Sequence, residues 1–212
     1  MQIFIALTIL MGEGGGGLAS DLQREAPRIE RPVLQKALAA SSCAAVQGVP
    51  VQSPLLTVID YSKPSVEPRL WVFDLEKRKL LFEELVAHGQ GSGENLARRF
   101  SNELGSLMTS LGLFRTGGIY QGRNGYTMKL EGLEPGYNDR SGVRAIVMHG
   151  AAYVSEAIAQ KLGRLGRSWG CPAVRQEVAR KLIDTIRDGS LVFAYYPDAG
   201  WQKDSKFLNC GR

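Results

Sequence analysis

A cysteine and a histidine in the second half of the chain have the settings of a nucleophile and its base. Cys171 lies in the run Ser-Trp-Gly-Cys-Pro at 168–172, and His149, one of two histidines, precedes Gly150. A cysteine attacks as its thiolate, so it needs a base, which can be far away in sequence. The non-catalytic alternatives are that Cys171 is a small buried side chain and that His149 is a structural residue. The two residues alone leave both interpretations open.

The elements around this pair predict how it is held. Residues 143–148 are apolar enough for a buried strand, so we expect His149 to lie at a strand end. Pro172 suits the first turn of a helix, and a helix N-terminus favours a thiolate. Gly170 permits close backbone approach. We therefore expect Cys171 to begin a helix.

The rest of the chain predicts a strand-rich fold. Period-two and apolar runs indicate strands at 55–61, 69–74, 79–87, 119–121, 126–130 and 191–196. Helical spacing favours helices at 33–47 and 174–187, with shorter ones at 94–100 and 152–159. Strands follow strands directly, so a parallel doubly wound sheet is not expected. We predict a mainly β (α+β) fold, a mixed β-sandwich or partly open barrel with helices on its flanks.

Bulk composition narrows the class of protein. The 212 residues carry a net charge of +5, which fits an anionic partner or a basic surface without specific meaning. Basic residues are scattered and form no recognised nucleic-acid module. The three cysteines match no zinc motif, and no metal or organic cofactor is expected. Cys43 and Cys210 could pair in an oxidising compartment, although nothing in the sequence places them together.

The ends of the chain predict its organisation. Residues 2–11 form an apolar run too short for a bilayer but suited to a signal-peptide core, with small residues before Ser20. A charged n-region is missing, so a buried strand stays the alternative. We divide the chain into a signal peptide or remnant (1–19), a linker and helix (20–50), a catalytic domain (51–200) and a peripheral tail (201–212).

The motifs resemble a known family. His-Gly followed by Ser-x-Gly-Cys resembles the YkuD-type L,D-transpeptidase catalytic domain, and residues 167–174 are similar to the murein branch of that family. Similar blocks lie at 87–89, 91–93, 100–102 and 137–139. The better-known branch has an arginine two residues after the cysteine, where this chain has Ala173. Any charge for a substrate carboxylate would then come from Arg164, Arg167 or Arg175.

The resemblance implies a barrel-like fold and acyl transfer on the tetrapeptide stem of peptidoglycan. Cys171 would be the nucleophile, His149 the base, and the Gly150 carbonyl the group that orients it. The N–H groups of Gly170 and Cys171 are the expected oxyanion donors. Substrate contacts are expected from Ser168, Trp169, Arg167, His88, Ser92, Tyr153 and Asn138. Ser168 could instead fix the loop, Trp169 could be core, and His88 could be an exposed loop residue.

Alternatives use the same residues. An L,D-carboxypeptidase or endopeptidase would pass the acyl group to water, and a wall-binding module would not need Cys171. A cysteine protease of ordinary peptides lacks its local signatures here. We expect an exported, monomeric protein of the periplasm or cell envelope, whose partner is peptidoglycan. Neither nucleic acid nor stable membrane insertion is expected.

Overall fold

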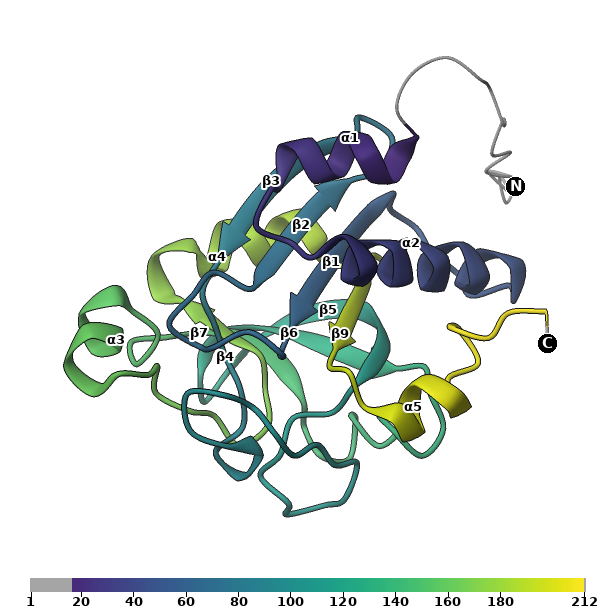
Figure 1. Cartoon of the computed structure of the whole chain (residues 1–212). Helices are drawn as coiled ribbons and strands as arrows, with labels where there is room; N and C mark the ends of the chain where they lie inside the picture. Colours follow the sequence, from purple (N-terminus) through teal and green to yellow (C-terminus); the bar gives the residue numbers. More distant parts are fainter. Residues whose placement is uncertain (1–16, 212) are drawn as a thin grey trace.

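The computed structural model describes residues 17–211 and contains a single sheet of nine strands (Figure 1). Their order across the sheet is β3-β2-β1-β9-β5-β6-β7-β8-β4. The strands are β1 Leu55–Asp60, β2 Leu70–Asp74, β3 Lys79–Glu84, β4 Val86–Ala87, β5 Gly112–Gly122, β6 Gly125–Gly132, β7 Val147–Ala151, β8 Ala173–Arg175 and β9 Leu191–Tyr195. Only β1–β9 and β7–β8 pair in parallel.

The sheet closes almost completely. β3 and β4 lie at opposite ends of the strand order, yet only Leu85 separates them in the chain. One stretch of chain therefore joins both edges of the sheet, and Arg175 of β8 donates to both Glu84 carboxylate oxygens of β3, at 2.8 and 2.9 Å. This barrel-like sheet with flanking helices confirms the predicted mainly β fold.

Five α-helices of the described residues flank this sheet: α1 Leu18–Glu25, α2 Arg31–Val46, α3 Glu156–Leu162, α4 Gln176–Ile186 and α5 Ala199–Asp204. A single 3-10 turn covers Gln90–Ser92. Helices α1 and α2 lie against the β1–β3 side (Figure 1). The amphipathic helix α4, predicted from the spacing of its apolar residues, buries Leu182, Ile183 and Ile186.

Two apolar cores follow from strand alternation. In β1, Leu56 and Val58 pack into the core that α1 and α2 cover, whereas Ile59 belongs to the core that α4 covers. Successive side chains of a strand point to opposite faces, so one strand serves both cores. Strand β1 is thus packed against an apolar core on each face.

Predictions for the segments near Cys171 and His149 are wrong in two places. Residues 143–145 form a turn, with Val143 71% exposed and Ala145 at φ +51°, so His149 lies in the middle of β7. Pro172 precedes the short strand β8, and α4 begins only at Gln176. Proline is tolerated just before a strand, because its missing N–H lies outside the ladder. Cys171 is therefore not at a helix N-terminus.

The chain ends also differ from expectation. Residues 18–25, expected to be leader and linker, form α1, and 94–100 is not helical. The predicted peripheral tail contains the fully buried Trp201. Cys210 forms a disulfide with Cys43 of α2, which is the pairing that the sequence left open. The signal-peptide core lies outside the described residues. Within residues 17–211, no helix has the length and apolar character needed to cross a membrane.

Candidate active site

Two neighbouring strands bring the histidine and the cysteine together. In the parallel pair β7–β8, His149 lies opposite Ala173, and Cys171 precedes Ala173 by two residues. Met148 and Val174, the alternate residues of these strands, pack into the core that α4 covers. The pairing of the strands, which no local pattern revealed, therefore makes close neighbours of two residues far apart in sequence.

The ring of His149 is held by the next residue. Its Nδ1 lies 2.9 Å from the Gly150 carbonyl oxygen, and the side chain is only 4% exposed. Burial lowers the pKa of His149, and the Gly150 carbonyl partly opposes this shift. A neutral imidazole that donates from Nδ1 has its lone pair on Nε2. The contact therefore selects the tautomer that can accept a proton at Nε2.

Cys171 is a buried thiol, 8% exposed, and the only cysteine of the described residues outside a disulfide. Its Sγ lies 3.6 Å from the Ala145 carbonyl oxygen. Burial raises the pKa of Cys171, whereas the Val147 N–H, the Arg144 charge and its own N–H favour the thiolate. At neutral pH the resting residue is a thiol, which needs a base to become nucleophilic.

The loop that carries Cys171 is tied down through its backbone. The Ser168 hydroxyl donates to the Cys171 carbonyl at 2.6 Å and accepts the Gly170 N–H at 3.1 Å. Gly170 has φ +126°, and a Cβ there would lie 2.7 Å from the Met108 carbonyl oxygen, so only glycine fits without strain. Because its N–H already binds Ser168, Gly170 does not supply the expected oxyanion donor. The Cys171 N–H is the better candidate.

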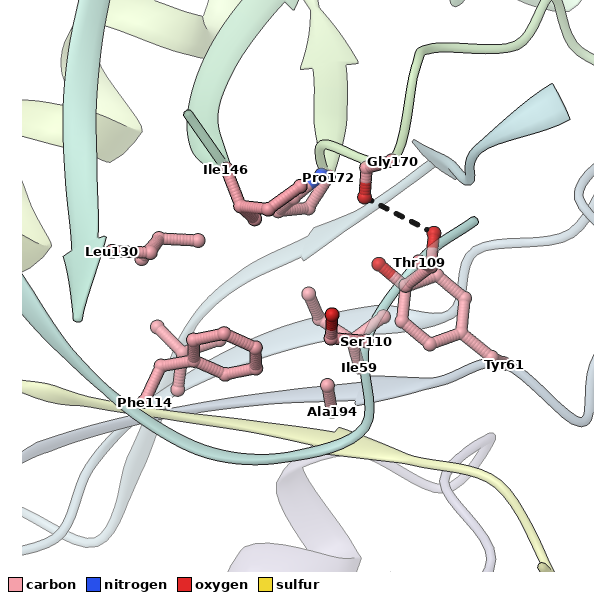
Figure 2. A pocket seen from close by; sticks show the side chains of 11 residues that line it. Ile59, Tyr61, Thr109, Ser110, Phe114, Leu130, Ile146, Gly170, Pro172 and Ala194 are labelled. Atoms are coloured by element: carbon pink, nitrogen blue, oxygen red, sulfur yellow. Dashed lines mark hydrogen bonds between the residues drawn. The ribbon is translucent and has the colours of Figure 1, made fainter. Parts of the chain in front are cut away.

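An apolar floor supports this loop. Figure 2 shows the Thr109 hydroxyl donating to the Gly170 carbonyl, at 3.2 Å, at a small cavity that Phe114, Leu130 and Ile146 also line. The cavity between them has a volume of about 10 Å³, which is room for roughly one water molecule. This space is too small for a peptide. The apolar side chains that line it pack beneath the loop.

Two of the expected substrate contacts, Trp169 and Tyr153, differ in their surroundings. The Trp169 side chain is 64% exposed, with the Arg123 guanidinium 5.4 Å from its ring centre, so Trp169 is not a core residue. Burial, and next the charge of Cys171, raise the pKa of Tyr153 to about 12. Tyr153 is therefore electrostatically coupled to Cys171.

His88 lies elsewhere and is not an exposed loop residue. It is buried, its Nδ1 accepts from Arg69 at 2.8 Å, and its Nε2 faces the Gly93 carbonyl at 3.3 Å. Burial, aided by the Arg69 charge, lowers the pKa of His88 to about 4. Both ring nitrogens are engaged inside the protein, so His88 is a structural residue rather than a substrate contact.

Ser92 and Asn138 are structural as well. The Ser92 hydroxyl accepts the Thr109 N–H at 2.9 Å, and the Asn138 amide donates to the carbonyls of Leu111 and Leu113, both at 3.0 Å. Both side chains are fully buried. Both side chains are hydrogen-bonded within the protein, and their expected contact with substrate stays a prediction.

The three arginines expected to bind a substrate carboxylate are all paired. Arg164 and Arg167 both contact Glu94, and Arg175 contacts Glu84. Two other arginines lie near the loop, although no motif points to them. Arg123 lies over Trp169, and Arg144 lies on the turn behind Cys171. Arg144 belongs to residues 143–148, for which the apolar pattern predicts a buried strand.

The comparison with protein families decides the identity. A family model described as the L,D-transpeptidase catalytic domain matches residues 25–195. The chain belongs to this family. The match includes α2, which we placed ahead of the catalytic domain and which shares a core with β1 and β9. Members of the L,D-transpeptidase family are enzymes of peptidoglycan.

Solved L,D-transpeptidases are also similar, at low identity. One from Mycobacterium smegmatis is 13% identical, with 68% of this chain and 59% of that chain covered and a TM-score of 0.41. One from Stackebrandtia nassauensis is 14% identical, with 86% and 78% covered and a TM-score of 0.41. The chain spans about six tenths of the length of the first of these structures. No curated protein matches.

Proposed function

We propose that the chain is an L,D-transpeptidase that transfers the acyl group of one peptidoglycan stem peptide to an amine of another. The observation that carries this proposal is the juxtaposition of Cys171 with His149, whose ring is held by the Gly150 carbonyl, in a chain of this family. A nucleophile, a base and an orienting group are the minimum set for thioester chemistry. Each of the three residues then has one role.

The first half-reaction forms the thioester. The Cys171 thiol gives its proton to Nε2 of His149, and the sulfur attacks the carbonyl carbon at the L,D bond of a tetrapeptide stem. The C–S bond forms, the oxygen becomes an oxyanion near the Cys171 N–H, and the C–N bond then breaks. The imidazolium returns its proton to the departing amine. The acyl group is now bound to sulfur.

The second half-reaction releases the product. The amine of a second stem attacks the thioester carbonyl, loses its proton to His149, and expels the sulfur, which is reprotonated. With water as the acceptor, the same steps give a carboxypeptidase or endopeptidase. The acceptor that fits beside Trp169 and Tyr153 decides between transfer and hydrolysis. We propose transfer, because an exposed tryptophan near the nucleophile offers a peptide an apolar surface.

A location in the cell envelope agrees with two further features. The Cys43–Cys210 disulfide suits an oxidising compartment such as the periplasm. The net charge of +5 suits the anionic wall. We therefore propose that the protein works on peptidoglycan as an exported monomer.

Intact-protein mass spectrometry after exposure to a carbapenem, an acylating mimic of the stem carbonyl, tests the proposal. We expect one adduct on the wild type and none on Cys171→Ala. Because Cys43 and Cys210 are joined, they do not compete for the reagent. A folded wild type without an adduct would count against an active acyl-accepting thiol and favour a wall-binding module.

Incubation with purified tetrapeptide stem fragments then separates the two enzymatic outcomes. A cross-linked dimer that is absent with Cys171→Ala supports transpeptidation. If only a tripeptide or another cleaved product forms, the activity is that of a carboxypeptidase or endopeptidase instead.

A further inference from the structure

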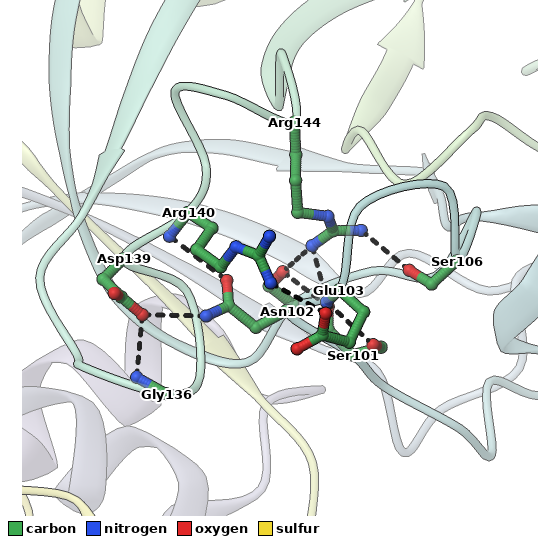
Figure 3. Close-up of polar contacts among 9 residues, drawn as sticks. Ser101, Asn102, Glu103, Ser106, Gly136, Asp139, Arg140 and Arg144 are labelled. Atoms are coloured by element: carbon green, nitrogen blue, oxygen red, sulfur yellow. Dashed lines mark hydrogen bonds and ion pairs between the residues drawn. The ribbon is translucent and has the colours of Figure 1, made fainter.

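Arg144 is a half-buried cation bound only by neutral groups. Its guanidinium donates to the carbonyls of Ser101 and Met108 at 2.7 and 2.6 Å, and to the hydroxyls of Ser106 and Ser110. Figure 3 shows Arg144 with Ser101 and Ser106. Among residues 17–211, no carboxylate forms a salt bridge with it. A fixed geometry and an uncompensated charge are thus combined in one side chain.

The cation lies beside Gly170, the residue that precedes Cys171. A Cβ built on Gly170 would be 3.4 Å from a terminal nitrogen of Arg144 and 2.7 Å from the Met108 carbonyl that this nitrogen binds. The next residue, Ala145, adopts φ +51° and directs its carbonyl to the Cys171 sulfur. Left-handed backbone at a non-glycine residue costs about 1 kcal/mol or more and often marks a functional site. The same turn therefore contacts the thiol and carries the charge.

Glu103, the one carboxylate that influences the pKa of Arg144, is paired with another arginine. Glu103 pairs with Arg140 at 2.7 Å and is mostly exposed to solvent. Burial lowers the pKa of Arg144, and the charge of Cys171 is the strongest influence in the opposite direction, ahead of Glu103. Buried charges in proteins are usually paired with an opposite charge. In the resting protein the partner is absent, because Cys171 is a neutral thiol.

We propose that Arg144 is the fixed counter-charge of the Cys171 thiolate, so that its pair forms only when His149 takes the thiol proton. The inference rests on the proposed acyl transfer. Arg144 gains and loses no proton in the step: the S–H bond breaks, the proton moves to Nε2 of His149, and the electron pair stays on sulfur beside the guanidinium. Arg144 is accordingly a positioning and electrostatic residue, distinct from the base.

No other cation in the described part of the chain couples to this sulfur. Tyr61 and Tyr153 also interact with the charge of Cys171, and burial raises the pKa of both, so both are neutral near pH 7. His149 on the neighbouring strand is neutral at rest, because burial lowers its pKa. Arg144 is therefore the group whose removal should change the thiol most.

The pH dependence of Cys171 alkylation by iodoacetamide tests the inference. Arg144→Gln should raise the apparent pKa of Cys171 by about 1, because an opposite charge at close range shifts a pKa by this order. At a fixed pH below that value, alkylation should be about tenfold slower. Arg144→Lys keeps the charge and should stay within about threefold of the wild type. Arg140→Gln removes a neighbouring arginine that is not coupled to the thiol, and should leave the pKa unchanged.

A second pair of variants covers the case in which Arg144→Gln does not fold. Ser106 is 3.2 Å from the guanidinium and only partly buried, so Ser106→Asp should give Arg144 a carboxylate partner and raise the thiol pKa. Ser106→Asn is the uncharged control of similar size. An unchanged thiol pKa in folded Arg144→Gln, or in Ser106→Asp where that variant fails, would overturn the inference. A wild type that forms no carbapenem adduct would instead count against the proposed function.

Discussion

Two corners of the molecule each combine an arginine with a histidine, and they differ in what is left for chemistry. In the first, Arg69 donates to the Val86 and Lys63 carbonyls and to Nδ1 of His88. In the second, Arg144 is bound by carbonyls and hydroxyls, and His149 binds only the Gly150 carbonyl through Nδ1. The first histidine uses both ring nitrogens internally, whereas the second keeps Nε2 for a proton.

Both corners contain the same residue types, so residue type alone does not decide their function. They differ in whether the histidine keeps Nε2 available for a proton. Burial lowers the pKa of Arg69 to about 10 and that of His88 to about 4, so near pH 7 Arg69 stays charged and donates to a neutral His88. The thiol beside Arg144 is instead a neutral group that becomes an anion on proton transfer. The Arg69 corner should therefore control stability, and the Arg144 corner reactivity.

Replacing the two histidines should give the largest contrast. His149→Gln removes the base, and we expect carbapenem acylation of Cys171 to slow by about 10² to 10⁴. His88→Gln should acylate at close to the wild-type rate in the folded fraction. Stopped-flow or time-resolved mass spectrometry measures both rates. An equal decrease in acylation rate in both variants would show that the two histidines do not differ in role.

Replacing the two arginines should have the opposite pattern for stability. We expect the larger loss of unfolding free energy in the Arg69 corner. Arg69→Met leaves the Val86 and Lys63 carbonyls and His88 Nδ1 without a donor in a fully buried place, which should cost roughly 4 kcal/mol. Arg144→Gln should cost less, because two of its partners, Ser101 and Ser106, are only partly buried. Urea unfolding followed by tryptophan fluorescence compares them. A greater loss for Arg144→Gln would make that residue chiefly structural.

Acid should weaken the Arg69 corner in a defined window. The pKa of His88 is about 4 in the fold and about 6.5 when unfolded, so the unfolded state binds the extra proton between these values. This contribution is complete above pH 6.5 and is lost as the pH falls to about 4, for a total of roughly 3 kcal/mol.

Unfolding free energies at pH 7 and pH 4.5 measure the loss, with His88→Gln as the control. The variant should show a smaller decrease than the wild type. The lowered pKa of His149 acts in the same direction, whereas the raised values of Asp60 and Glu134 oppose it, so the difference between the two proteins is the informative quantity. Identical pH profiles would show that His88 is not the titrating group.

The sequence predicted the features that depend on local pattern. Apolar runs located most strands and α4, and the Ser-x-Gly-Cys block located the nucleophile loop. It could not predict the turn at 143–145, because Val143 and Ala145 favour no turn and Arg144 obtains its partners from residues 101–110. The Cys43–Cys210 bond spans 167 positions, and β8 has only three residues, so neither leaves a periodic signal. His88 was misjudged because its partner Arg69 is 19 positions away.

The smallest expected effect concerns the surface beside the thiol. Trp169→Ala removes an exposed ring, so we expect the free energy of unfolding to change by no more than about 0.5 kcal/mol. If the ring binds the stem peptide, KM should rise about tenfold with kcat nearly unchanged, since uniform binding is lost. Steady-state kinetics on a tetrapeptide donor measures both constants, with Val46→Ala on α2 as an exposed control. A fall in kcat at constant KM would instead indicate that Trp169 orders the loop of Cys171 and acts through the nucleophile.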